Sequence, residues 1–335
     1  MVGEISQYLK QHWEELGFPR GKSPDLHFFK VGGNPWEEGR INFLVFESGQ
    51  SEPILFVKIV RNRVSNPSIR REYSILKRLE EDEALSPYLP LPIHLINISG
   101  RDMLLQRACH GKRMISLLSR NPFLYFQKTT LSMNFSRAME FVHNLNVRQK
   151  KRLTESEFRE SIVKPLSLFY DEYEDSREKK IRFADLLERL VAEMDGAFFV
   201  TPIHGDYSAT NIFIESTGQT KIIDWETARE EGLPFWDLFY FMSKYIHNMK
   251  IYPKNRWDRV LSIYMGRGWL SQLVHGTVDE YCRKTGFDVS LGRLIFPLHF
   301  LNKATIKDTM RGREAAQPWI RLFESSMQNL DQLCF

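Results

Sequence analysis

Residues 204–211 read HGDYSATN, and residues 221–226 read KIIDWE. The first stretch places a His, an Asp and an Asn within eight positions, and in the second an Asp ends an apolar run. The apolar runs FFVTPI, NIFIE and KIIDW surround these stretches, and the turn STGQ separates the last two. This pattern predicts a loop followed by a short β-hairpin, which would bring Asp206, Asn211 and Asp224 together.

These residue types suit phosphoryl transfer from a nucleotide. That reaction needs a carboxylate beside the acceptor hydroxyl, oxygen ligands for Mg²⁺, and a cation on the nucleotide phosphates. Kinases place the catalytic Asp five residues before an Asn, and a separate Asp binds the metal. With an ordinary carboxyl pKa of about 3.9, Asp206 is ionised at neutral pH and can accept the proton of an alcohol. The oxygens of Asn211 and Asp224 suit Mg²⁺.

A lysine and a glutamate upstream decide between this interpretation and ordinary turn residues. A single Asp in a turn or at a strand end usually has no chemical role. However, Lys58 lies in the apolar run ILFVKIV, and Glu72 follows 14 residues later in the helical stretch SIRREYSIL. The order of these residues along the chain is the one that a kinase needs: a Lys on a strand, a Glu on a helix, an Asp and an Asn in a loop, and an Asp in a hairpin.

The hydrophobic pattern changes near residue 106. Before this point, β-strands are expected at 26–31, 41–46, 54–60, 93–98 and 101–106, with one helix that begins at Pro67. Beyond it the pattern is mostly helical, with helices expected at 113–120, 123–148, 154–175 and 180–195, and again from Pro234 onwards. A small β-rich part and a larger helical part are therefore predicted, joined near 106–111.

The sequence resembles the aminoglycoside phosphotransferase and choline kinase-like family, small-molecule relatives of protein kinases. The resemblance covers about residues 55–241, and it rests on the segments VKIVRN, RREYSIL, LLQRACHG, FVHNL, HGDYSATNIF, IIDWETA and WDLFYF. It implies an α+β, protein-kinase-like bilobal fold. A small antiparallel β lobe with one helix, residues 1–106, would bind the nucleotide. A larger helical lobe, residues 107–335, would carry the catalytic hairpin and the acceptor site.

The resemblance also implies roles for single residues. Asp206 is expected to be the catalytic base, and Asn211 and Asp224 are expected to hold Mg²⁺. Lys58 would contact the phosphates of ATP or another nucleoside triphosphate, and Glu72 would orient Lys58.

Further residues would support the loop and meet the nucleotide. His204 is expected to buttress the catalytic loop, and Asp237 is expected to brace that loop by accepting backbone hydrogen bonds. The backbone near Gln106 and Arg107 would meet adenine.

Two positions depart from the family pattern. The segment KVGGNPWEEGRINF has Gly32, Gly33 and Gly39 at irregular spacing where a GxGxxG loop would cover the phosphates. Glycines there still permit close backbone approach to a phosphate, so Gly39 remains a candidate nucleotide contact. Gln106 stands where the family often has an acidic residue, so no preference between ATP and GTP follows.

Composition is that of a folded protein, with 42% apolar and 26% charged residues among 335. The N-terminal stretch lacks the basic start and apolar core of a secretory signal, and no apolar run approaches the roughly 20 residues that span a bilayer.

Cys109, Cys282 and Cys334 are widely spaced and favour free thiols in a reducing cytoplasm. No basic run interleaved with aromatic residues suggests nucleic acid.

The acceptor is expected to be a small molecule with a hydroxyl group. Only 12 residues separate Asp224 from Asp237, which leaves little room for a peptide-binding activation loop. Residues 251–335 hold 12 Lys and Arg against 8 Asp and Glu, and this excess equals the formal net charge of +4. The excess favours a neutral or anionic sugar-like acceptor near Lys303, Lys307 and Arg311, because like charges would repel a polycation.

Two alternatives stay open. An aminoglycoside or choline-type amino alcohol would fit if the aromatic residues of FWDLFYFMSKY formed a cage, although their helical spacing favours a core position. The chain could also be a catalytically silent nucleotide-binding scaffold of the same fold, despite the presence of the expected polar residues.

Overall fold

The structure is a computed structural model that describes residues 1–19, 24–33, 39–61, 67–118, 124–249 and 256–335. The described chain divides into two compact units. Unit 1 comprises Met1–Lys112 and Phe213–Glu226, and unit 2 comprises Arg113–Ile212 and Thr227–Phe335. Unit 1 is built on an antiparallel sheet and unit 2 is largely helical, which is the predicted α+β class. The functional division predicted at residue 106 stays a prediction, because compactness assigns no role to either part.

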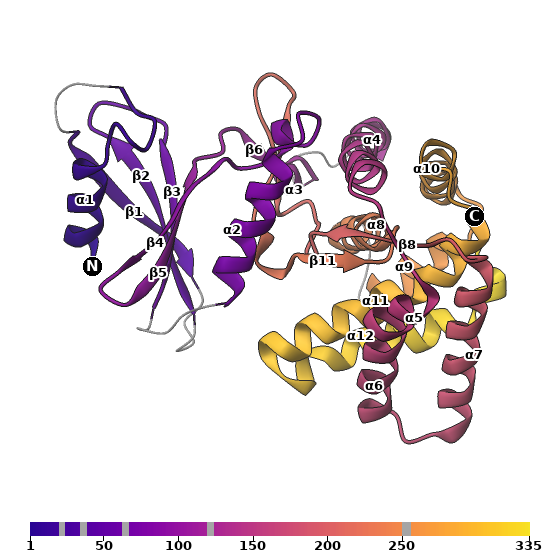
Figure 1. Ribbon diagram of the computed structural model, residues 1–335. Coiled ribbons are helices and arrows are strands. Elements are labelled where there is room, and N and C mark those ends of the chain that lie inside the picture. The colour runs from indigo at the N-terminus through magenta and orange to yellow at the C-terminus, as the bar shows by residue number, and fades with distance from the viewer. Residues whose placement is uncertain (20–23, 34–38, 62–66, 119–123, 250–255) are drawn as a thin grey trace. The chain divides into compact units, whose positions relative to one another are not determined.

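The sheet of unit 1 has the strand order β1-β2-β3-β5-β4 (Figure 1). Its strands match the predicted ranges closely and are β1 (Leu26–Gly33), β2 (Arg40–Glu47), β3 (Leu55–Val60), β4 (Pro92–Ile98) and β5 (Arg101–Arg107). Ser99 and Gly100 both have positive φ angles, of 51° and 79°, which suit a tight two-residue turn between β4 and β5.

The two faces of this sheet are covered by different helices (Figure 1). On one face Val57 and Ile59 of β3 cluster with Ile5 of α1 (Val2–Gln11). On the other face Val60 clusters with Ile69 of α2 (Pro67–Glu80), the helix that the sequence predicts. Because side chains alternate along a strand, Lys58 lies on the face that α2 covers. The N-terminal helix thus adds a second cover to the sheet.

Unit 1 also contains the predicted hairpin. Strands β9 (Ile212–Ile214) and β10 (Thr220–Ile222) flank a turn in which the N–H of Glu215 donates to the carbonyl of Gln219 over 2.9 Å. Gly218 in this turn has a φ of 87°, which glycine adopts without steric cost. A short strand, β6 (Lys112–Arg113), follows β5 in the chain.

Unit 2 has a small antiparallel sheet of order β11-β8-β7, formed by β7 (Lys151–Leu153), β8 (Phe198–Ile203) and β11 (Arg229–Gly232). The sequence predicts β8 but not its neighbours, which are too short to show an alternating pattern. The helices are α3 (Met114–Leu118), α4 (Leu124–Arg148), α5 (Glu155–Phe158), α6 (Lys164–Tyr173), α7 (Arg177–Glu193), α8 (Trp236–Asn248), α9 (Arg256–Tyr264), α10 (Trp269–Thr285), α11 (Val289–Arg311) and α12 (Arg313–Gln328). A π-helical segment, Arg159–Val163, joins α5 to α6.

The core of unit 2 is rich in aromatic side chains. Phe235, Phe239 and Phe241 around the start of α8 are completely buried. The ring of Phe239 packs edge-on against Phe296 of α11, with centroids 5.2 Å apart. The predicted core position of these aromatic residues is therefore confirmed, and they are not available to form a cage for a quaternary amine.

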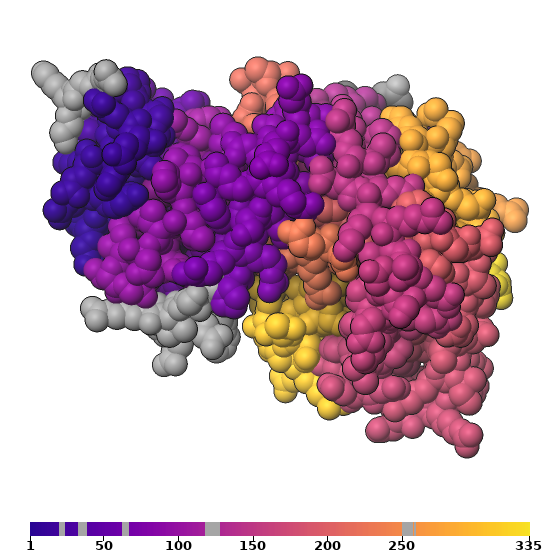
Figure 2. All heavy atoms as spheres, in the orientation of Figure 1, coloured from indigo at the N-terminus to yellow at the C-terminus, as the bar shows by residue number. Residues whose placement is uncertain are grey.

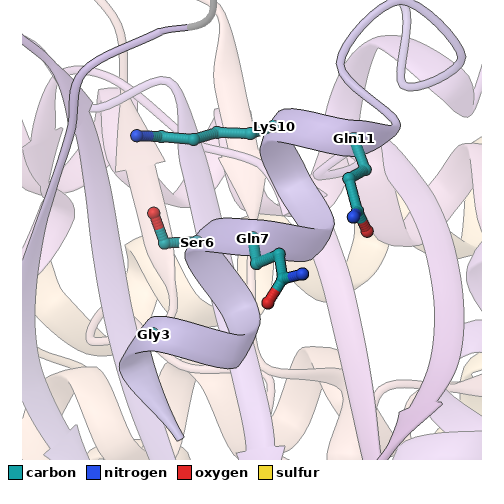
Figure 3. Close-up of a pocket in the computed structure, with 5 residues that line it drawn as sticks. All are labelled: Gly3, Ser6, Gln7, Lys10 and Gln11. Atoms are coloured by element: carbon teal, nitrogen blue, oxygen red, sulfur yellow. The ribbon is translucent and has the colours of Figure 1, made fainter.

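Figure 2 shows the N-terminal region, in indigo, at the surface of the molecule. A shallow hollow of about 520 Å³ lies along the outer face of α1 in this region (Figure 3). It is lined by Gly3, Ser6, Gln7, Lys10 and Gln11, all from one helix, and it contains none of the candidate site residues. Among the described residues, no helix is both long enough and apolar enough to cross a membrane.

We expect Asp102→Ala to destabilise unit 1, because Asp102 fastens α2 to the sheet. Its buried carboxylate accepts hydrogen bonds from Arg70 Nε and Nη2 over 2.8 and 2.9 Å, and from Asn97 Nδ2 over 3.0 Å. Loss of these charge-assisted bonds should lower the free energy of unfolding by about 2 kcal/mol in urea titrations. The exposed Glu81→Ala control should change it by less than about 0.5 kcal/mol. Equal small losses would contradict this role of Asp102.

Candidate functional site

Lys58 is the centre of the polar group in unit 1. It lies on β3 between apolar residues and is only 2% exposed. Its Nζ donates to Oε1 of Glu72 over 2.6 Å, and Glu72, on α2, is fully buried. A buried ammonium requires a carboxylate partner, so this pair fixes both the rotamer of Lys58 and the position of α2.

Asp224 approaches the same ammonium from the end of the hairpin. Lys58 Nζ donates to Oδ1 of Asp224 over 3.0 Å, and the Asp224 side chain is 40% exposed. The backbone of Asp224 has a φ of 67°, in the left-handed region that few residues other than Gly, Asn and Asp adopt. This conformation turns one carboxylate oxygen towards Lys58 and leaves part of the side chain open to solvent.

Arg40 is a further member of the group that the sequence analysis missed. Its Nη1 donates to Oε2 of Glu72 over 3.4 Å, and its guanidinium forms an ion pair with Glu226. Glu72 also accepts the backbone N–H of Trp225 over 3.3 Å. Glu72 therefore holds two cations and the chain that follows Asp224. A possible signal was the position of Arg40 at the start of β2, directly after Gly39.

Two further predicted residues, Gly39 and Gln106, lie at the edges of this group. The carbonyl of Gly39 accepts the N–H of Arg61 over 2.9 Å, while residues 34–38 of the predicted phosphate-covering loop lie outside the described residues. Gln106 on β5 pairs with Phe56, which places its side chain on the same sheet face as Lys58. Its Nε2 is buried without a hydrogen-bond partner among the described residues.

The side chain of Arg107 binds the N-terminal segment of the chain, near Gly17 and Phe18. Its guanidinium lies 4.0 Å from the ring centroid of Phe18 and donates to the carbonyl of Gly17 over 2.9 Å. Its backbone N–H donates to the carbonyl of Leu91 over 2.9 Å. The predicted contact of Arg107 with a nucleotide stays a prediction, since these donors already have protein partners.

In unit 2 the loop that carries Asp206 is held by a buried carboxylate. The N–H groups of His204 and Gly205 donate to Asp237 over 2.7 and 3.0 Å. Burial raises the pKa of Asp237, although the two N–H donors oppose that rise. The prediction that Asp237 braces the loop by accepting backbone hydrogen bonds is confirmed.

The loop backbone has little freedom at Gly205. This residue has a φ of 76°, and a Cβ added to it would lie 2.5 Å from the carbonyl oxygen of Thr227. His204 is fully buried, and its Nδ1 accepts the N–H of Asp206 over 3.2 Å. This geometry agrees with the predicted buttressing role of His204.

The carboxylate of Asp206 is contacted from three sides. Tyr240 of α8 donates its hydroxyl to Oδ1 over 2.9 Å, and Asn211 donates Nδ2 to Oδ2 over 3.2 Å. Lys303 of α11 forms an ion pair with Oδ1. The Asp206 side chain nevertheless remains 32% exposed, so the carboxylate can still meet a ligand.

Lys303 has a different role in the structure from the one that the sequence predicts. The charge of the C-terminal region predicts Lys303 near an acceptor, whereas in the structure its Nζ contacts Asp206 and donates to the carbonyl of Gly205, 3.1 Å away. Lys303 is only 2% exposed, and burial lowers its pKa to about 8. Burial alone would raise the pKa of Asp206, but the charge and hydrogen bond of Lys303, together with the charge of Lys307, hold it below its ordinary value.

The predicted site residues thus form two groups, each inside its own unit. Unit 1 brings together Lys58, Glu72 and Asp224 and also contains Gly39, Gln106 and Arg107. Unit 2 brings together Asp206 and Asn211.

Comparison with known proteins identifies the family. A family model described as the phosphotransferase enzyme family (APH) matches residues 37–268, which is more than half of the chain. The chain belongs to the phosphotransferase enzyme family. The match confirms the predicted resemblance and the predicted class of enzyme. A search among curated protein sequences finds no match.

Solved structures with a similar fold include kinases of small molecules. A protein assigned as a fructosamine-3-kinase, from Thermobifida fusca YX-ER1, is 13% identical, with a TM-score of 0.56 over 91% of this phosphotransferase and 95% of its own chain. A glucosamine kinase is 12% identical, with a TM-score of 0.51 over 97% of this chain and 83% of its own. At such identities the likeness establishes the fold alone, which is the predicted protein-kinase-like fold.

We expect Lys303→Met to shift the acidic limb of the pH profile of kcat/KM to higher pH. Lys303 is the main cause that lowers the pKa of Asp206, so loss of this cation should raise that pKa towards the value that burial favours. The resemblance implies that Asp206 is the catalytic base, and a base must be ionised to accept a proton. Activity would then begin to fall at a pH higher by about one unit or more.

Two further variants separate the effect of the positive charge of Lys303 from other effects of the Lys303→Met substitution. Lys303→Arg keeps a cation and should leave the limb near that of the wild type, whereas Tyr240→Phe removes a neutral donor and should shift it less. An acidic limb that is unchanged in Lys303→Met would contradict the pairing.

Proposed function

We propose that this phosphotransferase is a Mg²⁺-dependent kinase that transfers the γ-phosphoryl group of ATP, or of another nucleoside triphosphate, to a hydroxyl of a sugar-like or amino-alcohol acceptor. The observation that carries the proposal is the contact of the buried Lys58 with Glu72 and Asp224. It presents one cation and one partly exposed carboxylate side by side, which are the groups needed for nucleotide phosphates and their metal.

The nucleotide would lie against the face of the β-sheet that carries Lys58. The ammonium of Lys58 would bind phosphate oxygens, with Glu72 fixing its position. The unpartnered Nε2 of Gln106 lies on the same face and is available to a polar group of the nucleotide. The glucosamine kinase of similar fold has been solved in complex with glucosamine, ADP and inorganic phosphate, with 12% identity and a TM-score of 0.50 over 95% of this chain and 81% of its own.

Asp224 in unit 1 and Asn211 in unit 2 each offer an oxygen that suits Mg²⁺. Asp224 offers a carboxylate oxygen. Asn211 uses its Nδ2 on the carbonyl and Oδ2 of Asp206, which leaves its amide oxygen as a ligand. The described residues contain no group of three or more His, Cys, Asp and Glu that could hold a metal. When bound, Mg²⁺ would neutralise phosphate charge, with phosphate oxygens and water completing its coordination.

Asp206 would act on the acceptor. It accepts the proton of the acceptor hydroxyl, whose oxygen forms a bond to the γ-phosphorus while the bond from that phosphorus to the β,γ-bridging oxygen breaks. The products are a phosphate ester, ADP and a proton that passes from Asp206 to solvent. Tyr240 and Lys303 hold Oδ1 of Asp206, so the carboxylate is positioned before the acceptor arrives.

A small-molecule acceptor agrees with the short connection between Asp224 and Asp237. The aminoglycoside or choline type of acceptor and the silent scaffold remain the alternatives. Cys109, Cys282 and Cys334 are free thiols, which agrees with the cytoplasmic location that we propose. No partner other than the small-molecule acceptor is proposed, and binding to nucleic acid is not expected.

Two substitutions should separate the roles of the acidic residues. Asp206→Asn should lower kcat by about a thousandfold and leave the affinity for Mg-ATP nearly unchanged, because Asp206 acts on the acceptor. Asp224→Ala should instead remove the Mg²⁺-dependent part of ATP binding, measured by isothermal titration calorimetry. Asp331→Asn, at an exposed position, is the matched control and should change neither quantity.

The silent scaffold makes a different prediction. In that case the wild-type protein would bind a nucleotide but consume none of it in the presence of Mg²⁺ and a panel of alcohols. Small and equal losses of ATP affinity in both variants would also favour the scaffold over the kinase.

A further inference from the structure

Three lysines gather around Asp206 in unit 2, and we call them the lysine cluster: Lys244 of α8, and Lys303 and Lys307 of α11. Lys303 and Lys307 are four residues apart and therefore lie on the same side of their helix. Lys244 lies four residues after Tyr240, whose hydroxyl donates to Asp206. The two helices thus present their cations towards one carboxylate.

The cluster has more positive charge than its protein partners neutralise. Lys303 forms an ion pair with Asp206. Among the side chains that the structure describes, no carboxylate lies within ion-pair distance of Lys244 or Lys307, although both are partly buried. The pKa of each is lowered, first by burial, with Asp206 acting in the opposite direction. Partly buried cations that repel one another are costly unless an anion joins them.

The aromatic side chains beside the cluster already face lysines. Lys303 Nζ lies 4.3 Å from the ring centroid of Tyr240, and Lys244 Nζ lies 5.7 and 5.9 Å from those of Trp257 and Trp319. These rings stabilise the lysines by cation–π interactions. A second cation, such as a quaternary ammonium or an aminoglycoside amine, would have to displace a lysine from them and would be repelled by the others.

We propose that the acceptor carries an anionic group, a phosphate or a carboxylate, and that Lys244 and Lys307 bind this group while the hydroxyl of the same molecule lies at Asp206. This inference rests on the proposed function and narrows its acceptor to hydroxyl compounds that are anions, such as sugar phosphates. Lys303 is buried against Asp206 and positions that carboxylate, whereas Lys244 and Lys307 are partly exposed and can reach a ligand.

The test compares matched acceptors that differ in one anionic group: glucose 6-phosphate with glucose, ribose 5-phosphate with ribose, and glycerate with glycerol. Glucosamine and choline serve as cationic probes. In at least one pair the anion should have a kcat/KM about tenfold or more above that of its neutral partner and above those of both amines. In Lys244→Gln and in Lys307→Gln the KM of that anion should rise about tenfold, with smaller changes for the neutral compound and for ATP.

Arg321→Gln is the matched control, because Arg321 is an exposed cation on α12. It should leave all of these constants unchanged. The proposal is overturned if neutral or cationic acceptors are preferred in the wild type, or if Lys244→Gln and Lys307→Gln behave like Arg321→Gln. It is also overturned if the two variants raise the KM of ATP instead, since the cluster would then bind nucleotide phosphates.

Calorimetric titration of the wild type and the three variants keeps this test independent of turnover. Binding of glucose 6-phosphate or ribose 5-phosphate that is lost in the two lysine variants and kept in Arg321→Gln would support the anion site even without phosphoryl transfer. Absence of binding by all of the anionic probes would overturn it. Failure of the proposed function is read separately, as the absence of Mg²⁺-dependent ATP consumption by the wild type with every acceptor of the panel.

Discussion

Burial of an ammonium group is the constraint on which each of the two groups of candidate site residues depends. Lys58 and Lys303 are each removed almost completely from water, and neither position is tolerable without a carboxylate. In unit 1, Lys58 of β3 contacts Glu72 of α2 and Asp224 at the end of the hairpin, and so connects these three elements. In unit 2, Lys303 joins α11 to the loop of Asp206. Each buried charge therefore fixes a site residue as well as a fold contact.

The groups around Asp206 fix the orientation of its carboxylate but make that carboxylate a weak base. A nearby cation and hydrogen bonds keep its pKa low, so it stays ionised at neutral pH but is a weak base. This suits phosphoryl transfer through a loose transition state, in which the attacking hydroxyl keeps most of its proton until the bond to phosphorus forms. The rigid backbone at Gly205 and the two N–H bonds to Asp237 serve the same purpose, because they place the carboxylate in advance.

Much of the fold and part of the site follow from the sequence. Lys58 interrupts an apolar strand and Glu72 follows on an amphipathic helix, and the structure joins them as predicted. The short strands β7 and β11 leave no periodic signal. The role of Lys303 depends on a contact across 97 residues, which no local pattern encodes. A signal was nevertheless present: Lys303 ends the run LIFPLHFLN on a helix that is buried on nearly all sides, where a lysine needs a partner. The signal for Arg40, its position directly after Gly39, was weaker.

The positive charge near the C-terminus shows why net charge alone cannot identify an acceptor. The sequence grouped Lys303, Lys307 and Arg311, yet the structure separates them, since Arg311 is exposed, Lys303 is buried against Asp206, and Lys307 lies between these extremes. Exposed charges are screened by salt within about 10 Å, whereas partly buried ones retain their field. The electrostatic field at Asp206 is therefore set by buried and partly buried lysines and not by the exposed Arg311. Lys244 lies outside the C-terminal region that the count singled out, yet its pKa also responds to the charge of Asp206.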